Sequence, residues 1–148
     1  MAGTRTATVT WTGPLLEGEG SVSAGSSELF TDLPVSWPSR TEGPGGQTSP
    51  EELLAAAHGG CLTMSVAGEL TSADTPPGRL DVACTIVMDE VEGQGHQIVG
   101  SRVEIVARVD GVDDAALQAA LEKADAGCPF SQLLKRAGAT VTVTARLA

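Results

Sequence analysis

The stretch that decides the fold is residues 48–70, which read TSPEELLAAAHGGCLTMSVAGEL. Ser49 stands where an N-cap is expected, Pro50 is at the first helical position, and Glu52 completes a capping box. Small and apolar residues then recur at three-and-four spacing, which predicts one buried stripe made of Leu53, Leu54, Ala57, Cys61, Met64, Ser65 and Gly68. The stretch therefore predicts a long, central, buried helix with Cys61 near its middle.

Extended segments lie on both sides of this helix. Apolar and polar residues alternate clearly in some and weakly in others, and the predicted strands are residues 6–12, 20–24, 28–35, 79–90, 97–109 and 140–147. Strands and helices come in groups, which favours an α+β fold with helices packed against antiparallel sheets. At a length of 148 residues, we expect residues 1–148 to form a single domain.

Two shorter helices are predicted in the second half of the chain. We expect Asp113 to cap a helix that ends at Gly127. Cys128 then stands at the N-cap of a third helix, which begins with Pro129 and closes at Gly138. A thiol at that position meets unsatisfied N–H groups and the positive end of the helix dipole, which favour negative charge on sulfur.

Composition excludes several classes of function. The net charge is −10 and aromatic residues make up 3% of the chain, so we expect no nucleic-acid partner. No apolar stretch approaches the roughly 18 residues of a membrane span, and the first residues lack a charged segment followed by an apolar run. We therefore expect a cytoplasmic protein with no membrane partner. Two histidines and three cysteines show no zinc-ligand spacing, so we expect neither a metal nor a cofactor.

The three cysteines differ in their surroundings. Cys84 lies on an apolar strand face, and we interpret it as a core residue. Cys61 allows two interpretations, because a free cysteine is often a small core residue but can also be a nucleophile. Burial in a helix would raise the pKa of Cys61, so a nucleophilic role requires a nearby cation.

Two residues could supply that cation. His58 lies one turn before Cys61, and we favour a structural role for it. Arg40 lies in residues 34–49, a polar segment with no sustained period that predicts a long loop. A guanidinium stays charged and can hold both a thiolate and an acidic partner, so Arg40 is the better candidate, although a solvated loop arginine would look the same.

At these residues the sequence resembles the OsmC/Ohr family of thiol peroxidases, and its OsmC branch more than its Ohr branch. The matching segments are TSPEELLAAAHGGCLTMSVA around Cys61, AGCPFSQLLK around Cys128, WPSRTEG around Arg40, and the N-terminal VTWTGPLLEGEGSVS. Together they span nearly the whole chain. The sequence departs from the family pattern in having HGGC where small alanines are usual and CPFS where an aliphatic residue often follows the proline.

The resemblance implies an OsmC-like fold and an intertwined homodimer that reduces hydroperoxides. It implies that Cys61 is the peroxidatic cysteine and Cys128 the resolving one, while Arg40 and Glu51 orient and activate the thiolate. The expected cycle passes through a Cys61 sulfenic acid and a Cys61–Cys128 disulfide. An external dithiol resets the disulfide, and the family association is with lipoyl dithiols.

Helix geometry adds one constraint. Glu51 and Cys61 are ten residues apart, which is about 15 Å of rise and about 80° away from a common helix face. We therefore hypothesise that Arg40 and Glu51 meet Cys61 of the other subunit. Two other functions stay open: a redox sensor or binding protein that uses the same cysteine pair once, and a member of the fold whose activity is lost or altered.

Overall fold

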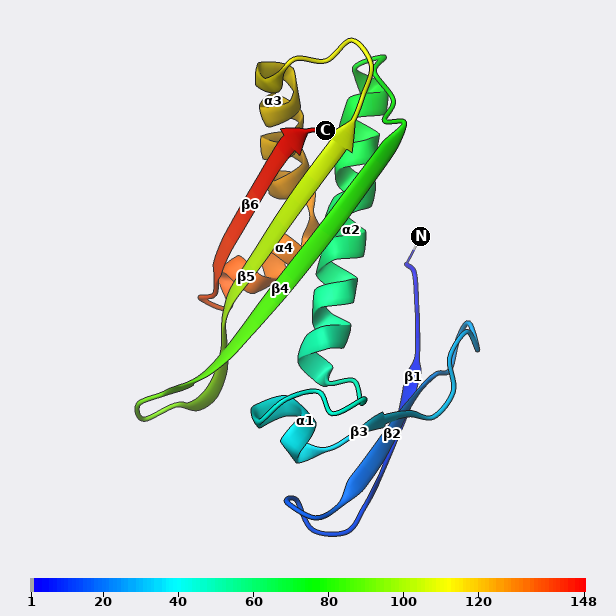
Figure 1. Ribbon diagram of the computed structural model, residues 1–148, viewed down its shortest axis with the longest axis vertical. Coiled ribbons are helices and arrows are strands. Elements are labelled where there is room, and N and C mark those ends of the chain that lie inside the picture. Colours follow the sequence, from blue (N-terminus) through cyan, green and yellow to red (C-terminus); the bar gives the residue numbers. More distant parts are fainter. Residues whose placement is uncertain (1) are drawn as a thin grey trace. The chain divides into compact units, whose positions relative to one another are not determined.

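The computed structural model describes residues 2–148. The chain divides into two compact units, an N-terminal unit up to Leu53 and a C-terminal unit from Leu54 to Ala148. Each unit contains its own three-stranded sheet, drawn in blue for the first and in green, yellow and red for the second (Figure 1). The boundary falls in the first turn of the long helix α2 (Pro50–Ser72).

The N-terminal unit is an antiparallel meander of β1 (Ala7–Thr12), β2 (Glu19–Ala24) and β3 (Leu33–Val35). Gly20 faces Trp11 across β1 and β2, where a Cβ would lie only 2.7 Å from the indole ring. Among residues 2–53 only Val22 and Val35 are buried, so this unit has almost no core of its own.

Two expectations for this unit need correction. The predicted strand at residues 28–35 shortens to β3, because Glu28 and Asp32 adopt positive φ angles of 55° and 53° that interrupt an extended chain. Residues 34–49 are not a structureless loop but contain helix α1 (Trp37–Thr41), which a Ser36 capping box begins. A helix of five residues is too short to show a period in the sequence.

Helix α2 begins as predicted. The Ser49 hydroxyl accepts a hydrogen bond from the Glu52 N–H at 3.1 Å. The reciprocal half of the predicted capping box differs, because the Glu52 carboxylate accepts from the Thr48 hydroxyl at 2.9 Å. The start of the helix is thus fixed by side chains on both sides of Pro50.

The buried face of α2 is not the predicted one. Its buried residues are His58, Gly59, Leu62, Val66 and Leu70. Met64, which we expected in the buried stripe, is 72% exposed, and Cys61 is only partly buried. The predicted stripe and the buried face are offset by one residue along the helix. Apolar residues occur on both, so their spacing does not distinguish the two faces.

The C-terminal unit contains β4 (Arg79–Val91), β5 (Gly95–Arg108) and β6 (Thr140–Leu147). Strands β4 and β5 form a long antiparallel hairpin. Strand β6 pairs with β5 in parallel, which departs from the antiparallel pairing expected throughout. The reason is the connection, because two helices lie between β5 and β6 in the chain and carry it back to the start of the sheet.

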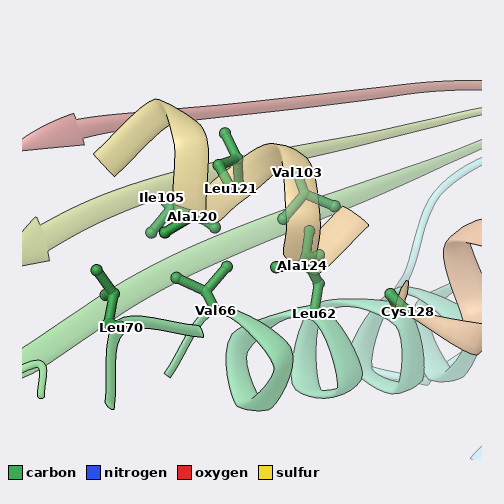
Figure 2. Close-up of a cluster of buried hydrophobic side chains, with 9 residues drawn as sticks. All are labelled: Leu62, Val66, Leu70, Val103, Ile105, Ala120, Leu121, Ala124 and Cys128. Carbon is green, nitrogen blue, oxygen red and sulfur yellow. The ribbon is translucent and has the colours of Figure 1, made fainter. Parts of the chain in front are cut away.

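Those helices are α3 (Asp114–Gly127) and α4 (Pro129–Arg136), and both begin at the expected caps, Asp113 and Cys128. Helices α2 and α3 pack with β5 around one buried cluster, shown in Figure 2, made of Leu62, Val66, Leu70, Val103, Ile105, Ala120, Leu121, Ala124 and Cys128. Cys128 lies at one end of this cluster, so the core of the C-terminal unit also positions a candidate site residue.

Among residues 2–148, α2 alone has the length and mean hydropathy of a membrane span. The sequence analysis predicted no such segment. A core helix of a soluble protein meets the same measure. Because α2 buries Leu62, Val66 and Leu70 in the C-terminal unit, we interpret it as a core helix.

Candidate functional site

Cys61 and Cys128 are neighbours in the C-terminal unit, although 67 residues separate them in the chain. The two sulfur atoms lie 3.4 Å apart, and both thiols are free. An S–S bond is about 2.0 Å long, so the sulfurs need to approach by about 1.4 Å to form a disulfide. Cys61 is partly exposed and Cys128 is fully buried, which gives an external oxidant access to Cys61 first. We call this pair the cysteine half of the site.

The surroundings of Cys61 oppose its ionisation. Burial raises the pKa of the Cys61 thiol, and the adjacent Cys128 thiol raises it further. The Phe130 backbone N–H and the Ser65 side chain lower the pKa but do not outweigh these effects. A reactive thiolate at Cys61 therefore requires positive charge from elsewhere.

The cation that the sequence favoured for this role, Arg40, is in the N-terminal unit. The Arg40 Nη2 atom lies 2.6 Å from Glu51 Oε1, and Nε lies 3.1 and 3.2 Å from the two carboxylate oxygens. Arg40 comes from α1 and Glu51 from the first turn of α2. The contact expected between these two residues is thus present, and we call the pair the arginine half.

The arginine half is fixed by charge and by an aromatic ring. Burial alone would raise the pKa of Glu51, but hydrogen bonds and the Arg40 charge lower it below its usual value. The guanidinium carbon of Arg40 also lies 5.4 Å from the centroid of the Trp37 ring, which is cation–π distance. Side-chain exposure is 31% for Arg40 and 13% for Glu51, so the cation keeps partial access to solvent.

Arg40 also lines an apolar pocket of the N-terminal unit. The pocket has a volume of about 330 Å³ and is lined by Val9, Trp11, Leu15, Val35, Ser36, Trp37, Arg40 and Pro50. Most of the wall is aliphatic or aromatic, which suits a hydrocarbon chain, and Arg40 is the one charged residue among the described residues that line it.

His58 has the structural role that the sequence favoured, with partners that the sequence did not reveal. Its ring is fully buried, with Nδ1 at 2.7 Å from Ser101 Oγ and Nε2 at 2.8 Å from Ser131 Oγ. Cys84 packs against the core as expected, and its sulfur lies 3.6 Å from Ser101 Oγ. Only Ser131 had a signal, since it stands in the AGCPFSQLLK segment.

Two free thiols within reach of a disulfide, one buried and one accessible, on an α+β scaffold define a two-cysteine thiol redox protein. A family profile described as OsmC-like protein matches residues 43–144. The chain belongs to the OsmC family. The α+β fold and the family predicted from the sequence are therefore confirmed.

Named relatives agree with this assignment. The chain is 35% identical to the peroxiredoxin OsmC of Escherichia coli over 125 residues, which cover 84% of this chain and 85% of that protein. It is 32% identical to an organic hydroperoxide resistance protein of Xanthomonas axonopodis over 121 residues, 80% of this chain and 82% of that one. A solved organic hydroperoxide resistance protein from Elizabethkingia anophelis is similar over 100% of both chains, with a TM-score of 0.75 and 25% identity. These names and the cysteine pair agree in indicating a cysteine-based peroxidase.

Proposed function

We propose that this protein is a thiol-dependent peroxidase that reduces organic hydroperoxides to alcohols, with Cys61 as peroxidatic and Cys128 as resolving cysteine. The observation that carries the proposal is the 3.4 Å separation of the two sulfurs. A pair of thiols at that distance can store the two electrons that a peroxide accepts, because it can close to a disulfide with little movement.

The first step is an attack by the Cys61 thiolate on the distal oxygen of ROOH. An S–O bond forms and the O–O bond breaks, so Cys61 is oxidised to a sulfenic acid while the peroxide is reduced. The alkoxide leaves as ROH after taking a proton. Arg40 lowers the pKa of Cys61 and stabilises the negative charge that develops on the leaving oxygen. Glu51 holds the guanidinium in position through its two oxygens.

The second step joins Cys61 to Cys128. Cys128 sulfur attacks the Cys61 sulfenic acid, the S–S bond forms, and hydroxide leaves as water with the proton that the Cys128 thiol gives up. A dithiol, for which we propose a lipoyl group, then reduces the disulfide by exchange and leaves as a disulfide itself. The cycle needs no metal and no bound cofactor.

The pocket beside Arg40 supports organic hydroperoxides over hydrogen peroxide. Its aliphatic and indole walls would gain burial of an alkyl chain at about 25 cal/mol per Å² of apolar surface. Hydrogen peroxide has no such surface to bury, so we expect it to be a weaker substrate.

We further propose that the protein acts as a homodimer. One face of α2 leaves Ala56, Gly60, Met64 and Gly68 exposed at four-residue spacing. In the N-terminal unit Val9, Leu15 and Leu16 are 66%, 55% and 68% exposed, beside a sheet with two buried residues. A second copy of the chain would cover such surfaces, which monomeric proteins rarely leave open.

The decisive experiment is steady-state peroxide consumption with a dithiol reductant. We expect kcat/KM to fall in the order fatty-acid hydroperoxide, tert-butyl hydroperoxide, hydrogen peroxide, and to be higher with dihydrolipoamide than with thioredoxin. A redox sensor, the alternative function, would stop after one equivalent of peroxide. Equal values for all three peroxides would contradict the organic-hydroperoxide proposal.

A mixing experiment tests whether the site is shared between subunits. A Cys61→Ser chain keeps its arginine half, and an Arg40→Ala chain keeps its cysteine half. If Arg40 acts on Cys61 of the other subunit, co-refolded mixtures contain one intact site per heterodimer and regain activity that neither parent has. Absence of any recovery, with heterodimers demonstrated by mass spectrometry, would show that each subunit uses its own pair.

A further inference from the structure

His58 is a buried titratable group that the peroxide chemistry does not use. Its ring joins three elements of the C-terminal unit, because it stands on α2 and contacts Ser101 on β5 and Ser131 on α4. All three side chains are nearly inaccessible, with exposures of 0%, 3% and 0%. A buried polar cluster that is fully hydrogen-bonded holds its members in one arrangement.

The contacts determine which ring nitrogen carries the proton. Burial lowers the pKa of His58, so the ring is neutral at pH 7 and has one N–H. With that proton on Nδ1, the ring donates to Ser101, the Ser101 hydroxyl donates to the Cys84 sulfur at 3.6 Å, and Ser131 donates to Nε2. With the proton on Nε2, the Ser131 hydroxyl hydrogen finds no acceptor among the described residues. The Nδ1–H form therefore gives an acceptor to the ring N–H and to both serine hydroxyls.

Ser131 connects this cluster to the cysteine half. Its backbone N–H donates to Cys128 Sγ at 3.5 Å, which is the N-cap hydrogen bond of α4. The same residue is thus held by His58 through its hydroxyl and contacts the Cys128 sulfur through its backbone. Cys128 Sγ in turn lies 3.4 Å from Cys61 Sγ.

We propose that His58 and Ser131 are positioning residues for the resolving step, and that the hydrogen bond between His58 Nε2 and Ser131 Oγ fixes the first turn of α4 with Cys128 facing Cys61. The inference rests on the proposed function, in which Cys128 is the resolving thiol. Neither residue touches the reacting sulfurs with its side chain. Their effect is on the rate at which Cys128 reaches and attacks the sulfur of Cys61.

A peroxide-free assay isolates that step. Dithiobis(nitrobenzoate) oxidises Cys61 to a mixed disulfide and releases one coloured thiolate. Cys128 thiolate then attacks the Cys61 sulfur, which forms the Cys61–Cys128 disulfide and releases the second coloured thiolate. The second release measures the attack by Cys128 directly, and Cys128→Ser identifies it by its absence. All chains carry Cys84→Ser, so that only two thiols react while a hydroxyl still accepts from Ser101.

Two matched pairs of variants separate positioning from general support of the fold. Ser131→Ala removes the buried hydroxyl that contacts His58 from α4, and Ser101→Ala removes the one that contacts it from β5. His58→Asn and His58→Gln each keep one amide, which occupies the place of Nδ1 in asparagine and of Nε2 in glutamine. We expect Ser131→Ala and His58→Asn to slow the second release about tenfold, the value of one such hydrogen bond. Ser101→Ala and His58→Gln should keep most of the rate.

The first release, which reports attack by Cys61, should stay unchanged in all four variants. An unchanged second release in Ser131→Ala would overturn the inference, and so would equal slowing in Ser131→Ala and Ser101→Ala. If a His58 variant fails to fold, the serine pair decides the question alone. Because no hydroperoxide is present, fast second release in a chain without peroxidase activity would refute the proposed function and leave this inference intact.

Discussion

The arginine half and the cysteine half differ in how their residues are held. Arg40 and Glu51 are fixed by an ion pair and an indole ring in a unit where two residues are buried, and Arg40 remains 31% exposed. Cys128 belongs to the core of the C-terminal unit and Cys61 packs against it, and the Ser131 backbone N–H donates to Cys128 Sγ. The N-terminal unit thus holds a charged pair in a polar, open region, and the C-terminal unit holds two sulfurs in a dense, apolar one. The proposed function uses both, because a thiolate needs nearby positive charge and disulfide formation needs two sulfurs held close together.

The largest effect is expected from removing the nucleophile. Cys61→Ser should abolish peroxidase activity, a loss of at least about 10³-fold, since serine is far less nucleophilic at neutral pH. The fold should be kept because the smaller serine hydroxyl fits in place of the thiol and Cys61 is partly exposed. Cys128→Ser is the matched variant: it should still consume one equivalent of peroxide and then stop. Full turnover in Cys61→Ser would show that the cysteine half is not the reactive centre.

Removing the charge should have the next largest effect. Arg40→Ala should lower kcat/KM by about 10²-fold, as loss of an electrostatic stabiliser does. Since burial already raises the pKa of Cys61, activity should rise with pH as the thiolate forms, and loss of Arg40 should move that rise to higher pH.

A second arginine provides the control for this prediction. Arg79 forms a comparable ion pair with Asp81 at exposed positions of strand β4, so Arg79→Ala should leave both kcat/KM and the pH profile unchanged. Identical pH profiles for Arg40→Ala and the unmodified chain would mean that Arg40 does not act on Cys61.

A substitution on the exposed stripe of α2 should weaken the dimer while leaving the fold of each chain intact. A Cβ at Gly68 would meet no atom within 4 Å, so Gly68→Leu should fold and should gain helix propensity of about 1 kcal/mol. If α2 packs against a second copy through its exposed stripe, the leucine side chain would overpack that contact. The dimer dissociation constant should then rise at least about tenfold. Sedimentation equilibrium measures it, with Ala115→Leu on α3 as control. An unchanged constant would place the interface elsewhere.

The smallest expected effect concerns pH and stability. His58 has a folded-state pKa below its usual value of 6.5 because burial opposes its charge, while Asp125 raises it and Lys135 lowers it. The unfolded chain therefore binds a proton that the folded chain does not, and stability is full above about pH 6.5 and falls below it. Unfolding by urea at pH 7 and pH 5 should show this loss. His58→Gln should lose less stability over the same range, and an equal loss in both chains would assign the slope to other groups.

The sequence predicted much of the fold, because most elements carry a local signal. Ser49 and Asp113 mark helix starts by their hydrogen-bonding chemistry, and the alternation at residues 140–147 marks a strand. What failed lacked such a signal. Helix α1 is shorter than two turns, and the parallel partner of β6 depends on the path of two helices, which no local pattern encodes.

The candidate site divides in the same way. Arg40, Glu51, Cys61 and Cys128 stood out because they lie in segments that resemble a family, and the contacts expected within each half are present. Ser101 was not anticipated, because it lies 43 residues from His58 on a strand where serine carries no special pattern. The face of α2 was wrong for a related reason, since both candidate stripes contain small apolar residues and only the surface that they pack against distinguishes them.

The parallel pairing of β5 with β6 also bears on how a new chain is made. Helix α2 and strands β4 and β5 precede residues 140–147 in the chain and leave the ribosome first, so the β5 edge that pairs with β6 stays open until β6 arrives. An open edge can pair with another chain. During the same interval α4 has not yet packed. If Cys128 is the resolving thiol, as proposed, Cys61 then lacks the partner that would protect its sulfenic acid from over-oxidation to the irreversible sulfinic acid. On the proposed function, a new chain would therefore be most open to oxidative damage before α4 and β6 have packed.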